Sequence, residues 1–220
     1  MMGPICHWRG ELPAVDLREV LRYAACREED ERVMALAREC AAEGEAILRP
    51  SLCWRRVSAA VSEEAVVLPF TVIPSRKLAA ALKGCEEAVI FAATVGLDLD
   101  RLIARYGRLS PAKGLLLQAY GAERVEALCD AFCCWLAGEC APFVPGKRFS
   151  PGYGDWPLEG QRELFGTLNC HKEIGLYLNE SLLMSPTKSV TAIVGLGDGE
   201  VCGEKSCKAC GKNDCDFRKE

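Results

Sequence analysis

Apolar and polar positions follow two different periods along this chain, one typical of helices and one typical of strands. Apolar residues recur at helical spacing in four ranges, which predicts helices over 16–23, 28–48, 98–106 and 110–138. Asp16 is the predicted N-cap of the first helix, and Ser110-Pro111 supplies a capping hydroxyl and a first-turn proline for the last. Runs rich in valine and bounded by Pro or Gly predict strands over 51–58, 64–72 and 87–95, with a short helix over 75–82.

Helices and strands are mixed in this order without a regular strand–helix–strand alternation. The pattern therefore predicts an α+β fold, with a mixed or antiparallel twisted sheet and flanking helices. We expect residues 1–69 to form a helical and strand extension packed on the main domain, and residues 70–199 to form the core. The composition changes near Gly197, which predicts a short Cys-rich tail over 200–220.

Composition and charge narrow the class of protein. The net charge of −4 offers no basic field for nucleic acid, and every apolar run is interrupted before it could cross a membrane. The first ten residues lack the apolar segment of a secretion signal. Of 14 cysteines, the ten outside the tail are spread through helix-like and strand-like segments, so we interpret them mainly as small core residues in a reducing cytosol. We expect a cytoplasmic protein with neither nucleic-acid nor membrane partners.

The loop around Arg148 is the first candidate binding site. An arginine held in a Pro/Gly loop is a natural partner for a carboxylate, because its guanidinium can bind both oxygens. Gly152 permits close approach of the backbone to a ligand, and Tyr153 offers an aromatic face and a hydroxyl for a purine or a ribose. Taken alone, the loop also fits a tight turn with a surface arginine and a packed tyrosine.

A longer pattern extends this interpretation. Arg148-x-x-x-Gly152-Tyr153, with Pro151 before the glycine, is followed by Glu180-Ser181-x-x-Met184-x-Pro186 and an apolar strand. Together these resemble the S-adenosylmethionine-binding activation domain of cobalamin-dependent methionine synthase, over roughly residues 70–196. The resemblance implies an S-adenosylmethionine site that includes Arg148, Pro151, Gly152, Tyr153 and Ser181.

The same resemblance implies a role in reactivation. In that family, one electron from a flavodoxin-like donor and the methyl group of S-adenosylmethionine restore an oxidised cobalamin. This chain lacks an Asp-x-His-x-x-Gly corrinoid motif, so the corrinoid is expected on a separate methionine synthase or other corrinoid methyltransferase. Two competing hypotheses are a non-catalytic module that binds S-adenosylmethionine or a corrinoid protein, and a small iron–sulfur electron carrier.

Two acidic residues on the longest predicted helix form a second candidate. Glu126 and Asp130 share a helix face, where two like charges need a cationic neighbour. The resemblance implies that this neighbour is the sulfonium of S-adenosylmethionine, with Asp130 at the main contact position and Glu123 as an alternative. A solvated acidic stripe, paired with Arg124 or a remote lysine, is the other interpretation.

Four cysteines near the end of the chain form the third candidate. The spacing Cys202-x4-Cys207-x2-Cys210-x4-Cys215, among Gly, Lys and Asn, suits four thiolates around one metal centre. A zinc ion would be structural, whereas an iron–sulfur cluster could pass electrons. The sequence does not decide between them, and a redox-sensitive tail or a disulfide pair stays an alternative.

Overall fold

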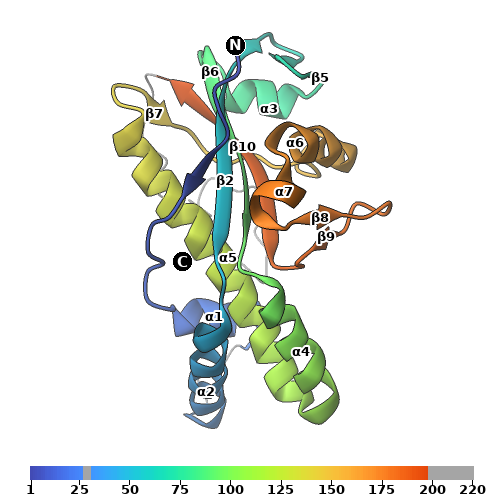
Figure 1. Ribbon diagram of the computed structural model, residues 1–220. Helices are drawn as coiled ribbons and strands as arrows, with labels where there is room; N and C mark the ends of the chain where they lie inside the picture. Colours follow the sequence, from blue (N-terminus) through green and yellow to red (C-terminus); the bar gives the residue numbers. More distant parts are fainter. Residues whose placement is uncertain (27–30, 198–220) are drawn as a thin grey trace.

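A five-stranded antiparallel sheet forms the centre of the protein, in a computed structural model that describes residues 1–26 and 31–197 (Figure 1). Its strands lie in the order β1-β2-β6-β10-β7. They are β1 Cys6–Trp8, β2 Ser51–Ser58, β6 Glu87–Thr94, β10 Ser189–Gly197 and β7 Val144–Pro145. Every neighbouring pair is antiparallel, which confirms the predicted α+β class.

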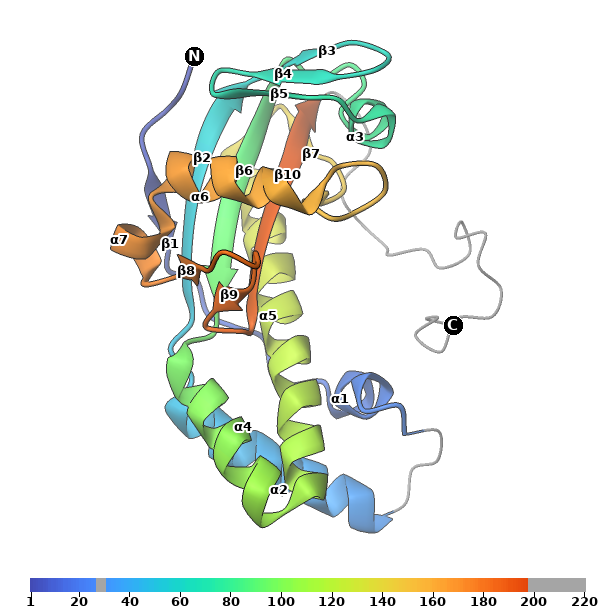
Figure 2. The ribbon, with the colours of Figure 1, turned by 90° about the vertical axis from the view of Figure 1, so that its right-hand side faces the viewer.

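Helices cover both faces of this sheet (Figure 2). On one face lies α5 Pro111–Glu139, with α1 Leu17–Tyr23, α2 Glu31–Ile47 and α4 Leu97–Leu109 packed around its end beyond the sheet. On the other face lie α3 Arg76–Ala81, the 3-10 turn η1 Leu158–Gly160, α6 Gln161–Leu168 and α7 Cys170–Ile174. The central strand β6 faces both layers, since Phe91 belongs to the core on the α5 side and Ile90 to the core on the α6 side. Burial on both faces explains its unbroken apolar run.

The N-terminal helices pack where α5 extends beyond the sheet. Helices α1, α2 and α4 all contact α5 there, as Figure 2 shows below the sheet. The adjacent residues Glu123 and Arg124 of α5 form a buried ion pair. Arg124 also donates to the carbonyls of Pro13 and Ala14, at 2.7 and 3.3 Å, so the segment that enters α1 is tied to α5.

Most predicted elements are confirmed, and two details are wrong. Asp16 does cap α1, accepting from the N–H groups of Arg18 and Glu19 at 2.9 and 3.3 Å. Helix α5 begins at Pro111 as predicted, but the hydroxyl of Ser110 makes no capping bond. The strand predicted over 64–72 is instead a hairpin of β4 Val66–Leu68 and β5 Thr71–Ile73, because Pro69 at the turn cannot donate to a ladder.

The remaining strands are short. β3 Ala60–Val61 joins the β4–β5 hairpin in a three-stranded sheet, and β8 Tyr177–Leu178 pairs with β9 Met184–Ser185. The division at residue 69 stays a prediction; β2, from the N-terminal part, lies between β1 and β6 in the central sheet. The predicted tail over 200–220 lies outside the described residues. No helix in the described ranges combines the length and apolar character needed to span a bilayer.

Candidate functional site

The loop that carries Arg148, residues 146–156 and here called the signature loop, is held along the edge of β10 by backbone hydrogen bonds. Gly146 donates to the carbonyl of Gly195 at 2.8 Å, just after β7 has paired with the end of β10. Phe149 and Ile193 exchange both of their backbone bonds, at 2.9 and 2.8 Å. Arg148 is therefore attached to a rigid strand on both sides, and its backbone has little freedom.

The Arg148 side chain meets the acidic pair of α5. Its Nη2 atom lies 2.7 Å from Oε2 of Glu126 and 2.8 Å from Oδ1 of Asp130. The side chain of Arg148 is 14% exposed, whereas that of Asp130 is 58% exposed. Burial disfavours the charged guanidinium, but the surrounding acidic groups outweigh it and hold the pKa of Arg148 above its usual value. Arg148 therefore stays positively charged although its side chain is mostly buried.

One nitrogen of this guanidinium, Nη1, is buried and has no hydrogen-bond acceptor within the part of the chain that the structure describes. An unsatisfied buried donor costs about 1–3 kcal/mol. A buried, unpaired donor of this kind favours an acceptor supplied by a ligand, and a carboxylate oxygen forms a strong charge-assisted bond to a guanidinium.

The structure therefore brings together candidates that are distant in sequence. Arg148 from the signature loop is a cation that lies beside both Glu126 and Asp130. The alternative acid, Glu123, is engaged elsewhere, with Arg124 and with the N–H of Asp16 at 3.2 Å. The roles of these residues toward a ligand stay predictions.

Pro151, Gly152 and Tyr153 form a tight turn beyond Arg148. Gly152 has a φ of +89°, a conformation that favours glycine, and it donates to the carbonyl of Trp156 at 2.9 Å. Pro151 is buried beneath the turn, while Tyr153 is 70% exposed. The packed tyrosine of the plain-turn interpretation is thus wrong, and the ring is available to a ligand.

Asp155 fastens this turn to the start of α3, a role that sequence reasoning missed. Its carboxylate accepts from the hydroxyl of Ser75 and from the N–H groups of Arg76 and Lys77, at 2.9 and 3.3 Å. The Ser75 hydroxyl, and then the N–H groups of Lys77 and Arg76, hold the pKa of Asp155 below its usual value. The available signal was a carboxylate in a Gly-rich turn, but its partners lie far away in the chain.

Ser181 is not brought into contact with Arg148. It lies exposed in the turn of the β8–β9 hairpin, and no hydrogen bond in the described part of the chain joins it to the signature loop. Of the pattern over 180–186, only Met184 and Ser185 pair with another strand. After the hairpin, Thr187 is bound to Asp100 of α4 by its N–H and its hydroxyl, both at 2.7 Å.

The metal candidates Cys202, Cys207, Cys210 and Cys215 lie outside the described residues. Elsewhere, over 1–26 and 31–197, no three His, Cys, Asp or Glu side chains gather as a metal site would require. Six cysteines in these ranges are buried, as predicted for core residues: Cys40, Cys53, Cys129, Cys133, Cys140 and Cys170. Cys134 is exposed, so the core interpretation is wrong for it.

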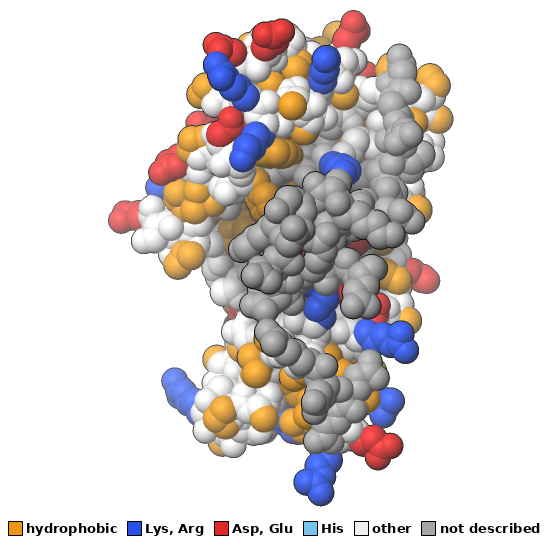
Figure 3. Space-filling model, turned by 180° about the vertical axis from the view of Figure 1, so that it is seen from behind, with side chains coloured by type: hydrophobic (Ala, Val, Ile, Leu, Met, Phe, Trp, Pro, Cys, Tyr) orange, Lys and Arg blue, Asp and Glu red, His pale blue; other side chains and the backbone are white. Residues whose placement is uncertain are grey.

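The surface away from the loop offers hollows and mixed charge. A hollow of about 520 Å³ lies between β1 and the end of α7, lined by Trp8 and Glu173, and one of about 360 Å³ lies beside the β8–β9 hairpin. Neither is lined by Arg148. Among the described side chains on the face in Figure 3, basic ones are interspersed with acidic and apolar ones instead of forming one basic area.

Comparison with known proteins identifies the class of fold. No family model matches the chain, and no curated protein matches it. Among solved structures, the fold is similar to that of the MetH reactivation domain in its crystal structure bound to AdoHcy, with a TM-score of 0.65 and 15% identity, covering 90% of this chain and 79% of that one. At this identity the match shows a shared fold.

Proposed function

We propose that this chain binds S-adenosylmethionine and assists the reductive methylation, and so the reactivation, of a corrinoid carried by a separate protein. Two independent lines support the proposal. The fold is that of a domain whose crystal structure contains AdoHcy, the demethylated form of S-adenosylmethionine. The signature loop, recognised from its residues, is the segment that carries Arg148 to the acidic pair on α5.

The observation that carries the proposal is the half-satisfied guanidinium of Arg148. Glu126 and Asp130 hold Nη2 and so fix the orientation of the group, while the buried Nη1 has no acceptor within the described residues. The carboxylate of the methionine moiety would supply that acceptor. A hydrogen bond between this buried guanidinium and a ligand carboxylate would contribute about 1.5–3 kcal/mol to binding.

The neighbouring residues fit the other parts of the ligand. Gly152 presents backbone without a side chain, and Tyr153 presents an exposed ring to a purine or a ribose. Asp130 is more than half exposed, so its carboxylate can face a ligand cation while one oxygen stays near Arg148. S-adenosylmethionine supplies the methyl group when bound, and these side chains hold and orient it.

The corrinoid and the electron come from partners. We propose a corrinoid-carrying methyltransferase or methionine synthase as the main partner, and a flavodoxin-like or iron–sulfur protein as the reductant, in the cytoplasm. The four cysteines of the tail are proposed to hold zinc or an iron–sulfur cluster. In the second case the tail itself could deliver the electron.

An anaerobic methylation assay tests the whole proposal. The chain is mixed with a purified corrinoid protein in its oxidised state, a reductant and S-adenosylmethionine, and the visible spectrum of the corrinoid is followed. We expect the methylated spectrum to appear with the wild-type chain and to be strongly slowed with Arg148→Ala. The opposite outcome is that the chain binds S-adenosylmethionine while none of several corrinoid proteins becomes methylated. That result would contradict reactivation and support a non-catalytic binding module.

A further inference from the structure

We propose that Asp155 is a positioning residue that fixes the turn containing Gly152 and Tyr153 for ligand binding. This inference rests on the proposed function, because it concerns the same S-adenosylmethionine site. Asp155 lies outside the Arg-x-x-x-Gly-Tyr pattern itself. It is assigned this role by the contacts that join its carboxylate to α3.

The signature loop has two attachments, one on each side of the ligand-binding turn. The first is the pair of backbone bonds between Phe149 and Ile193 of β10. The second is the carboxylate of Asp155, which accepts from Ser75 and from the backbone of Arg76 and Lys77. Gly152 and Tyr153 lie between the two attachments, so loss of the second would leave the far side of the turn held without its polar contacts to α3.

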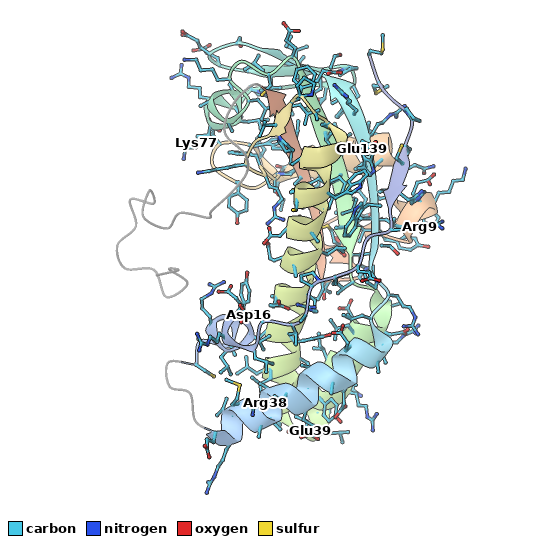
Figure 4. All side chains as sticks on the ribbon, turned by 90° about the vertical axis from the view of Figure 1, so that its left-hand side faces the viewer. Arg9, Asp16, Arg38, Glu39, Lys77 and Glu139 are labelled. Atoms are coloured by element: carbon cyan, nitrogen blue, oxygen red, sulfur yellow. The ribbon has the colours of Figure 1, made fainter. Side chains whose placement is uncertain are left out.

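The second attachment ends on a rigid part of the core. Ser75 is fully buried, and its Oγ accepts from the N–H of Leu78 at 3.0 Å while its hydroxyl donates to Asp155. Lys77 lies against the turn as well, because a Cβ added to Gly154 would come within 2.7 Å of its Cδ. Figure 4 shows Lys77 on the side of the molecule where α3 meets the loop. Asp155 thus connects a Gly-rich turn to the start of a packed helix.

Trp156 also holds the chain after the turn. Its ring is 4% exposed, stacks on Phe149 with ring centroids 6.3 Å apart, and belongs to the same core cluster as Leu78 of α3. Asp155 adds the polar contacts that join the end of the turn to the first residues of α3, and so adds to the ordering of Gly152 and Tyr153 before the ligand arrives. An ordered loop binds more tightly because less conformational entropy is lost on binding.

The test combines two measurements on Asp155→Ala, Asp155→Asn and Ser75→Ala in the full chain. Hydrogen exchange of the ligand-free protein reports the order of the turn. In Asp155→Ala we expect the amides of Gly152 and Tyr153 to exchange about tenfold faster, with those of Phe149 and Ile193 unchanged. Ser75→Ala should give a smaller increase, and Asp155→Asn should restore part of the protection because its amide oxygen can still accept.

Calorimetry then measures the ligand affinity of the same variants. Asp155→Ala should weaken S-adenosylmethionine and S-adenosylhomocysteine by the same factor, about tenfold, since the Asp155 carboxylate is engaged by Ser75 and the backbone of α3. Glu159→Ala, an exposed carboxylate just beyond the turn, is the matched control and should change neither measurement.

The outcomes separate this inference from the proposed function. Unchanged amide exchange in Asp155→Ala would overturn the positioning role, whatever the wild type binds. Faster exchange in a protein whose wild type binds neither ligand would support the attachment and count against the proposed function. Faster amide exchange in Asp155→Ala with unchanged affinity for both ligands would overturn the claim that the contacts of Asp155 with α3 support ligand binding.

Discussion

Arg148 is the residue on which the candidate site depends, and its environment explains why. The sequence predicted a carboxylate-binding arginine in a Pro/Gly loop and an acidic pair in need of a cation. It could not show that each is the other's neighbour, because Arg148 and Glu126 are 22 positions apart and meet only through the packing of the loop on β10 and α5. Contacts between residues so far apart in the sequence depend on the topology of the fold, and the local pattern of apolar and polar residues does not predict them.

Asp130 offers a prediction about ligand charge. Asp130→Asn should weaken S-adenosylmethionine more than S-adenosylhomocysteine, because only the former carries the sulfonium charge that a carboxylate attracts. Two calorimetric titrations measure the difference. The matched control is Glu139→Gln, which removes the same charge from an exposed position at the far end of α5 (Figure 4). Equal losses for both ligands would show that Asp130 does not sense the sulfonium.

At the scale of elements, the sequence predicts a helix or strand most accurately where a few neighbouring residues determine it. The N-cap of α1, the start of α5 at Pro111 and the doubly buried strand β6 all follow from residues within a few positions. The β4–β5 hairpin was missed because an apolar run continues across Pro69 on both sides.

The buried pair Glu123–Arg124 gives a prediction about how α1 is held. Arg124→Ala should lower the free energy of unfolding by about 3–5 kcal/mol, because it leaves a buried carboxylate unpaired and frees the carbonyls of Pro13 and Ala14. The double change Glu123→Leu with Arg124→Met should cost less than the single one, since no charge stays buried. Denaturant unfolding measures the free energy of unfolding of both variants. The control is Arg38→Ala, at an exposed position of α2. A double variant less stable than the single one would contradict this account.

At the scale of the whole molecule, elements far apart in the chain together position Arg148. Every element that positions Arg148, from α5 through β7 to β10, lies at or before Gly197 in the chain. Truncation after Gly199 should therefore leave the affinity for S-adenosylmethionine within about twofold of the full chain, a difference under about 0.5 kcal/mol. Calorimetry of the truncated and full chains makes the comparison.

The same truncation tests the metal proposal for the tail. Elemental analysis of anaerobically purified protein should find one zinc site or one iron–sulfur cluster in the full chain and none in the truncated chain. If iron is present, the truncated chain should bind ligand yet fail to support reductive methylation. Neither zinc nor iron in the full chain would contradict the metal proposal and leave the ligand site unaffected.

The central claim, that the signature loop binds S-adenosylmethionine through Arg148, is tested most directly by calorimetry. Wild-type protein, Arg148→Ala and the neighbouring exposed control Lys147→Ala are titrated with S-adenosylmethionine, and thermal unfolding verifies that each is folded. The account predicts binding by the wild type and the control, and a loss of about 1.5–3 kcal/mol in Arg148→Ala. Equal affinity of Arg148→Ala and wild type, or no binding by the folded wild type, would contradict it.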